Sequence, residues 1–281
     1  ALFAEALMQL RPWKLWSKKS NKSGGGSLGA AMDTAALWMK SDEDEDGGAA
    51  ADAAEEGAGY DSETLEIERV LEDGLARWPL HPSLCHLYVH LMEMSDTPEA
   101  ALEPACANLR SRWPCFGHLV HMASHIDMQV GGYADAIKAN EEGVAADLVY
   151  CKLRGLETYY LGYLVHNYHM LCWAALFEGK AAQAEEAARV VVRETMPPTM
   201  LEAYGDFLEP YCAGKWHVWV RFGKWRKILA EPLPSEAGVS EESLAAPKAK
   251  FLVCEATALY AQATARAVQG DTVGDPFKDT S

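Results

Sequence analysis

Histidine is the residue whose spacing in this chain points most directly to chemistry. Eight of the nine histidines lie between His81 and His169. At about 100° per helical residue, His86, His90 and Glu93 fall at about 0°, 40° and 340° around a helix. These three side chains therefore line one narrow stripe of a predicted helix.

Two further stripes follow along the chain. His118, His121 and His125 fall at about 0°, 300° and 340°, and His166 and His169 are about 300° apart. We expect the three stripes to lie on the first helices of three successive helix pairs. Because neighbouring packed helices lie roughly 9–10 Å apart, side chains from all three stripes could converge on one pocket.

Imidazoles and a carboxylate on helix faces form a ligand set for a transition metal. The pattern predicts Zn, Fe or Cu as the cofactor. Glu93 is the candidate catalytic residue, as a general base, although it could also be a ligand. His118 and Asn167 are expected to orient the ligating rings through hydrogen bonds. The expected metal ligands are His86, His90, His121, His125, His166 and His169.

A structural alternative exists for every one of these rings. A single histidine on an apolar helix is usually a buried residue that bonds to a neighbour, and Tyr88, Ser124, Asn167 and Tyr168 are available partners. We favour a metal or polar catalytic pocket over a purely structural network, because seven of these eight histidines follow three stripes. His81, beside Pro82, is expected in a turn, and His217 is expected only to pack.

The elements that carry these stripes are predicted to be helices joined by short turns. Alanine is abundant, and no alternating strand pattern competes. Gly132, Gly179, Gly223 and Gly270 mark turns at spacings of 47, 44 and 47 residues. An earlier turn at Asp96 lies 36 residues before Gly132. Such turns, several followed by alanine-rich helices, are typical of tetratricopeptide repeats of about 34 residues with longer helices or inserts.

Several short sequence stretches, in addition to the repeat pattern, resemble those of a known family. The chain resembles a family of tetratricopeptide-repeat proteins, mostly bacterial, and the resemblance implies the fold more than an activity. The chain departs from the family at Ala123, where proline is common, and in the long connection between Trp16 and Thr64. The stretches that carry the resemblance are His81-Pro82 with His86 to His90 and Glu93, Gly117 to Ile126, Gly132 to Ala136 with Asn140-Glu141, His166 to His169, and Val220 to Trp225 with Ile228 to Pro232.

The fold class is therefore expected to be all-α, an antiparallel helix-pair solenoid with a disordered acidic insertion. Residues 1–17 are expected to end a helix of a truncated repeat region, and residues 18–60 to form the low-complexity insertion. Residues 61–281 are expected to form the repeat domain. The segment 41–63 holds ten acidic residues and no Lys or Arg, so the rest of the chain carries only about −6 of the net charge of −16.

Composition narrows the partners and the compartment. The mildly acidic remainder argues against nucleic acid, which requires a basic surface. His166 and Asn167 interrupt the longest apolar stretch and argue against a membrane span. Seven cysteines without a C-x-x-C pair suggest reduced thiols in the cytoplasm.

Two functions remain open from the sequence. The first is a binding scaffold that holds a peptide, a protein or a small molecule in a concave groove, with a His-rich metal pocket. The second is a metal-dependent enzyme, a hydrolase or an oxidoreductase, built on the same scaffold.

Overall fold

The structure is a computed structural model that describes residues 1–10, 15–16, 60–110, 112–233 and 251–270. These residues form helices and contain no strand, which confirms the all-α prediction. The predicted insertion at residues 18–60 lies outside the described residues except for Tyr60. Contacts divide the chain into two compact units, residues 1–143 and residues 144–281.

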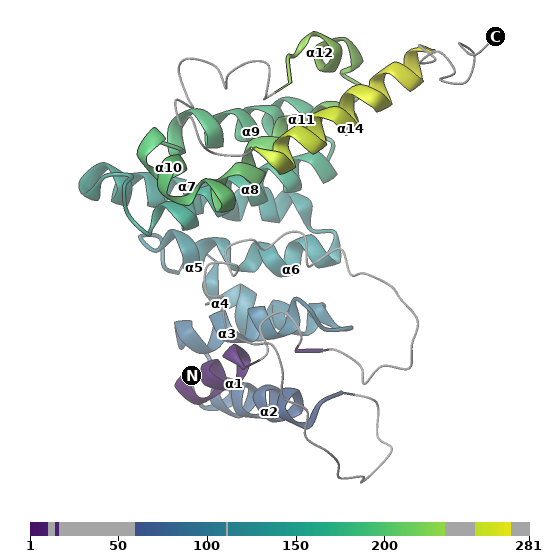
Figure 1. Ribbon diagram of the computed structural model, residues 1–281. Coiled ribbons are helices and arrows are strands. Elements are labelled where there is room, and N and C mark those ends of the chain that lie inside the picture. Colours follow the sequence, from purple (N-terminus) through teal and green to yellow (C-terminus); the bar gives the residue numbers. More distant parts are fainter. Residues whose placement is uncertain (11–14, 17–59, 111, 234–250, 271–281) are drawn as a thin grey trace, which may run out of the picture. The chain divides into compact units, whose positions relative to one another are not determined.

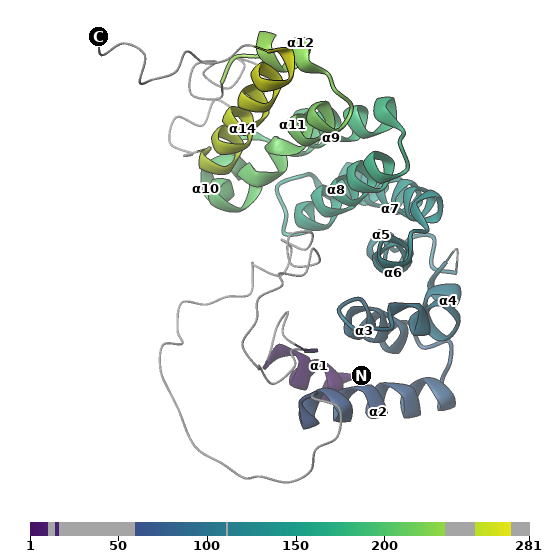
Figure 2. The ribbon, with the colours of Figure 1, turned by 90° about the vertical axis from the view of Figure 1, so that its right-hand side faces the viewer.

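The first unit contains the helices that position most of the histidines. Helix α2 packs against α3, and α3 packs against α6 (Figures 1 and 2). Short 3-10 and π segments lie between α3 and α4. The elements are α1 (Leu2–Gln9), α2 (Ser62–Arg77), α3 (Pro82–Met92), η3 (Pro98–Ala101), η4 (Leu102–Cys106), α4 (Ala107–Leu109), α5 (Gly117–His121), α6 (Ala123–Val130) and the first part of α7 (Tyr133–Arg154).

Side-chain caps set the starts of α2 and α3. Asp61 caps α2 and accepts a hydrogen bond from the backbone N–H of Glu63. His81 caps α3, where its Nδ1 accepts from the backbone N–H of Leu84 at 3.4 Å. The prediction that His81 is a turn residue is therefore confirmed, and the cap fixes where the histidine stripe of α3 begins.

The core of the first unit lies between α2, α3 and α6. Leu71, Leu91 and Ile126 are fully buried there. Burial of each such side chain contributes about 1.5–3 kcal/mol to folding. Trp16 joins this core, and its indole Nε1–H donates to the carbonyl of Leu91 at 2.7 Å. This packing fixes the position of α3 within the first unit and with it the direction of its histidine face.

The second unit is also helical. Helices α8 and α9 pack closely along each other, and Ala184 and Ala188 of α9 are buried. Trp216, from the aromatic stretch expected to be core, is fully buried, whereas Tyr204 is exposed. The remaining elements are the end of α7, α8 (Leu161–Phe177), α9 (Ala181–Thr195), α10 (Pro198–Leu208), η5 (Glu209–Ala213), α11 (Gly214–Arg221), α12 (Trp225–Ala230) and α14 (Leu252–Gln269).

Glycines with positive φ follow five of the described helical segments: four lie at or next to the turns predicted from the sequence, and the fifth, Gly155, follows α7. Gly179, Gly223 and Gly270 have positive φ, as expected for turn positions that favour glycine. At the remaining turn the left-handed residue is Gly131, with φ of 81°, and not the predicted Gly132. Gly131 is the C-cap of α6, and the N–H of Gly132 closes the turn on the carbonyl of Asp127 at 2.7 Å.

The sequence also led to expectations about membrane spans and about the cysteines. Among the described helices, none combines the length and the apolarity required to cross a membrane. The seven cysteines are all thiols, and six of them are buried, whereas Cys115 is exposed.

Candidate metal centre

Five histidine rings of the first unit form one contiguous group. Neighbouring ring centroids lie 4.7–5.3 Å apart, which is close packing for aromatic rings. The rings come from α3, α5 and α6, and Glu93 at the C-terminal end of α3 lies among them. We call this group the imidazole cluster: His86, His90, His118, His121 and His125.

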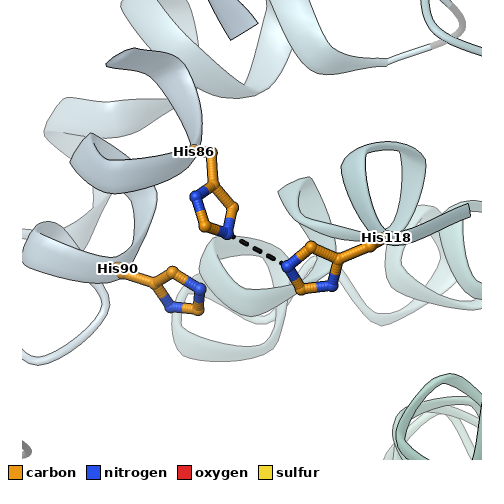
Figure 3. Close-up of side chains that lie close together, drawn as sticks. All are labelled: His86, His90 and His118. Atoms are coloured by element: carbon orange, nitrogen blue, oxygen red, sulfur yellow. Dashed lines mark hydrogen bonds between the residues drawn. The ribbon is translucent and has the colours of Figure 1, made fainter. Parts of the chain in front are cut away.

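One part of the cluster has donor atoms close enough to share an ion. The donor atoms of His86, His90 and His118 all lie within 4.8 Å of one another. The Nε2 atoms of His86 and His118 are 3.0 Å apart, and the three rings point toward a common space in Figure 3. Two nitrogens that bind one tetrahedral zinc ion are about 3.3 Å apart, so little movement would be required.

Glu93 fixes the orientation of two rings at once. Its Oε1 lies 2.7 Å from His90 Nδ1, and its Oε2 lies 2.7 Å from His125 Nδ1. A carboxylate only accepts hydrogen bonds, so both rings carry their proton on Nδ1. The lone pair of each neutral ring is therefore on Nε2, which is the atom that it can offer to a metal.

Asn140 on α7 sets the protonation of His121 in the same way. Its Nδ2 donates to the carbonyl of Ala136 at 2.9 Å, which turns its Oδ1 toward His121 Nδ1 at 3.2 Å. His121 therefore donates from Nδ1 and presents the lone pair of Nε2. That atom lies 3.2 Å from Nε2 of His125.

The electrostatics of the cluster favour an ionised Glu93 carboxylate and a neutral His86 ring. Burial alone raises the pKa of Glu93, but the charges and hydrogen bonds of His125 and His90 outweigh this effect and hold that pKa well below its usual value. Burial, together with nearby His90 and His125, lowers the pKa of His86 to about 3 against the opposing charge of Glu93. Neutral imidazole is the form that binds a metal.

Not all the predicted ligands belong to this unit. His86, His90, His121 and His125 are in the imidazole cluster, whereas His166 and His169 lie on α8 of the second unit. His169 Nε2 accepts a hydrogen bond from the Trp173 indole at 2.7 Å. The Nε2 lone pair of His169 is therefore used in a hydrogen bond. This agrees with the alternative that a single buried histidine bonds to a neighbouring side chain.

The histidine expected only to pack also lies in the second unit. The rings of His217 and Trp173 have centroids 5.4 Å apart with an interplanar angle of 42°. Burial lowers the pKa of His217. This contact agrees with the packing role predicted for that residue.

The residues expected to orient the rings are distributed differently from the prediction. The donor atom of His118 lies within 4.8 Å of those of His86 and His90, so this residue could be a ligand as well as an orienting group. The Asn167 amide donates to Asp147 Oδ2 at 2.7 Å, within the second unit. Asn140 was not predicted, although a polar amide one turn after Ala136 in an alanine-rich helix was a signal that could have identified it.

The comparisons with known proteins provide no independent assignment of this cluster. No protein-family model, no curated protein and no solved structure matches the chain.

Proposed function

We propose that this chain is a helical-repeat protein whose function depends on a transition-metal ion bound by His86, His90 and His118. The observation that carries the proposal is the convergence of three imidazoles from α3 and α5, with all donor atoms within 4.8 Å of one another. Imidazole nitrogen suits Zn, Cu, Fe and Ni, so the expected ion is one of these rather than Mg or Ca.

The accessibility of the site favours a reactive ion over a closed structural one. The His90 side chain is 22% exposed, and His86 and His118 are also only partly buried. Three protein ligands leave one position for water or substrate, as in catalytic zinc sites. This supports the metal-dependent enzyme, by hydrolysis or by oxidation, as the role of the pocket.

Glu93 has a positioning role in this proposal. Both of its oxygens accept hydrogen bonds from imidazole Nδ1 atoms, which favours a role in orienting the rings. A carboxylate behind a ligating histidine fixes the ring and raises its basicity. The proposal therefore gives Glu93 a different role from the general base expected from the sequence.

The repeat architecture is part of the same proposal. Four of the five left-handed glycines of the described residues, Gly131, Gly179, Gly223 and Gly270, recur every 44–48 residues, with Gly155 as an additional one between the first two, and α8 and α9 pack as a pair. Both features support a tetratricopeptide-like arrangement. In such a scaffold a groove would bring a peptide, a protein or a small molecule to the metal.

Elemental analysis tests the metal directly. The full chain, purified without a His tag and without chelators, is expected to contain about one equivalent or more of a transition metal. His86→Ala and His118→Ala should each lose the ion at this position, whereas the control His217→Gln in the second unit should retain it. Wild-type protein that stays metal-free after incubation with Zn²⁺, Cu²⁺, Ni²⁺ and Fe²⁺ would refute the proposal.

A further inference from the structure

His121 and His125 are not needed for the ion proposed above, yet they have the geometry of a ligand pair. Their Nε2 atoms are 3.2 Å apart, close to the separation of about 3.3 Å for two nitrogens on one tetrahedral ion. They stand outside the group formed by His86, His90 and His118. The pair is therefore a candidate for a separate ion.

The hydrogen bonds made by the two Nδ1 atoms determine which form the facing Nε2 atoms take. Asn140 Oδ1 accepts from His121 Nδ1, and Glu93 Oε2 accepts from His125 Nδ1. With both Nδ1 atoms donating outward, the two Nε2 atoms face each other at 3.2 Å. A cation between the two Nε2 atoms, either a proton or a metal ion, can be bound by both rings at this separation.

A buried carboxylate next to the pair can compensate a positive charge between the two rings. His121 is fully buried, and His125 is 5% exposed. An isolated cation in such a place would be costly, but the ionised Glu93 carboxylate contacts His125 and compensates the charge. The same carboxylate contacts His90, a ligand of the first ion, so one anion serves both positions.

We propose that a second transition-metal ion binds between Nε2 of His121 and Nε2 of His125, and that the imidazole cluster is a dinuclear centre. The inference rests on the proposed first site. The two positions are neighbours, because the ring centroids of His118 and His121 are 5.3 Å apart and those of His90 and His125 are 5.2 Å apart. Water-derived or substrate oxygen completes the coordination of the second ion, as in other two-metal sites.

Copper titration of the full, tag-free chain tests this inference. Apoprotein is loaded with Cu²⁺, separated from unbound metal and analysed for copper content and by electron paramagnetic resonance. We expect two equivalents and a spin-coupled pair with a half-field signal. His125→Gln and His121→Gln should each bind one equivalent and give an uncoupled signal, and His118→Ala should do the same by losing the other ion.

The outcomes separate the two proposals. Wild-type protein that saturates at one equivalent, retained in His125→Gln and lost in His118→Ala, would overturn the dinuclear centre and leave the first site standing. Wild-type protein that binds no metal would overturn both. Because copper content and spin coupling are measured on the wild type, misfolding of a variant, which circular dichroism would detect, does not remove the test.

Discussion

Glu93 and His125 are 32 residues apart in the sequence, and Oε2 of the first lies 2.7 Å from Nδ1 of the second. The contact joins the end of α3 to α6. The other oxygen of Glu93 contacts His90 on its own helix at 2.7 Å. One buried carboxylate therefore sets the protonation of two rings on different helices, and through them the direction of their metal-binding nitrogens.

Replacement of Glu93 should weaken both proposed metal positions together. In Glu93→Gln the amide can accept from only one of the two rings, so the other loses its orienting hydrogen bond and the compensating charge disappears. Loss of such a group typically reduces metal affinity about 10–100-fold. Competition titration with a chromogenic chelator measures this change.

The exposed Glu66 provides a control for the loss of one carboxylate. Glu66→Gln removes the same charge from α2 and should leave metal affinity unchanged. If Glu93→Gln bound metal as tightly as the wild type, the carboxylate would not orient the ligands.

Replacement of Asn140 should weaken binding of only the second proposed ion, between His121 and His125. In Asn140→Leu, His121 loses the acceptor at 3.2 Å that keeps its proton on Nδ1. The second Cu²⁺ should bind about 10–100-fold more weakly, with the first unchanged. The variant should also be destabilised by about 1–3 kcal/mol, because a buried donor loses its partner. Calorimetric titration separates the two binding events.

A matched control for this variant lies on α4. The Asn108 amide donates to the carbonyl of Pro104, four residues earlier, as Asn140 donates to Ala136. Asn108→Leu removes an equivalent bond away from the cluster and should change stability without changing either metal affinity. Equal effects of the two variants on the second ion would show that Asn140 acts only through the fold.

The fold and the candidate site differ in how far the sequence could predict them. Helices and their glycine turns depend on local spacing, so most turns were identified, and the error at Gly132 was one residue. The stripes also predicted that His86, His90, His121 and His125 lie on helix faces. Which rings share a contact depends on packing between helices, and a helical wheel cannot show this.

His118 and Asn140 illustrate what was missing. The ligand-group position of His118 depends on the approach of α5 to α3, which brings its Nε2 to 3.0 Å from His86. Asn140 contacts His121 only because α7 returns beside the cluster after the turn at Gly131. Both relationships arise from tertiary structure rather than from a periodic pattern.

Removal of metal should destabilise the first unit. A ligand that binds only the folded state stabilises it by about 2.7 kcal/mol when its free concentration is 100 times Kd. Treatment with a chelator should therefore increase hydrogen exchange in α3 and α6, and added Zn²⁺ or Cu²⁺ should restore protection. Ca²⁺, which prefers oxygen ligands, is the control and should have no effect. Exchange that is unchanged by chelation would contradict a bound ion.

Acid should destabilise the second unit through His169. Burial, with the charges of His166 and His217 nearby, lowers the pKa of this ring to about 3. The unfolded chain takes up a proton near pH 6.5 but the folded ring does not, so stability is lost as the pH falls from about 6.5 to about 3. The loss is up to about 1.4 kcal/mol per pH unit. Urea unfolding in chelator, followed by tryptophan fluorescence, should show a shallower slope for His169→Gln than for the wild type.

Asp147 should make the stability of the second unit depend on pH in the opposite direction. Burial raises the pKa of this carboxyl to about 6, although hydrogen bonds from Tyr160 and Asn167 oppose the effect. Between about pH 4 and pH 6 the carboxyl group of Asp147 is therefore protonated in the folded state and ionised in the unfolded state. Stability from this group is greatest at the acidic end and falls by up to about 3 kcal/mol as the pH rises through 6. In Asp147→Asn this dependence should disappear, because the amide stays neutral and still accepts one of the two hydrogen bonds. Urea unfolding from pH 4 to pH 7 measures the slope, with the exposed Asp206→Asn as the control. An unchanged slope in Asp147→Asn would mean that the buried carboxyl is ionised throughout this range.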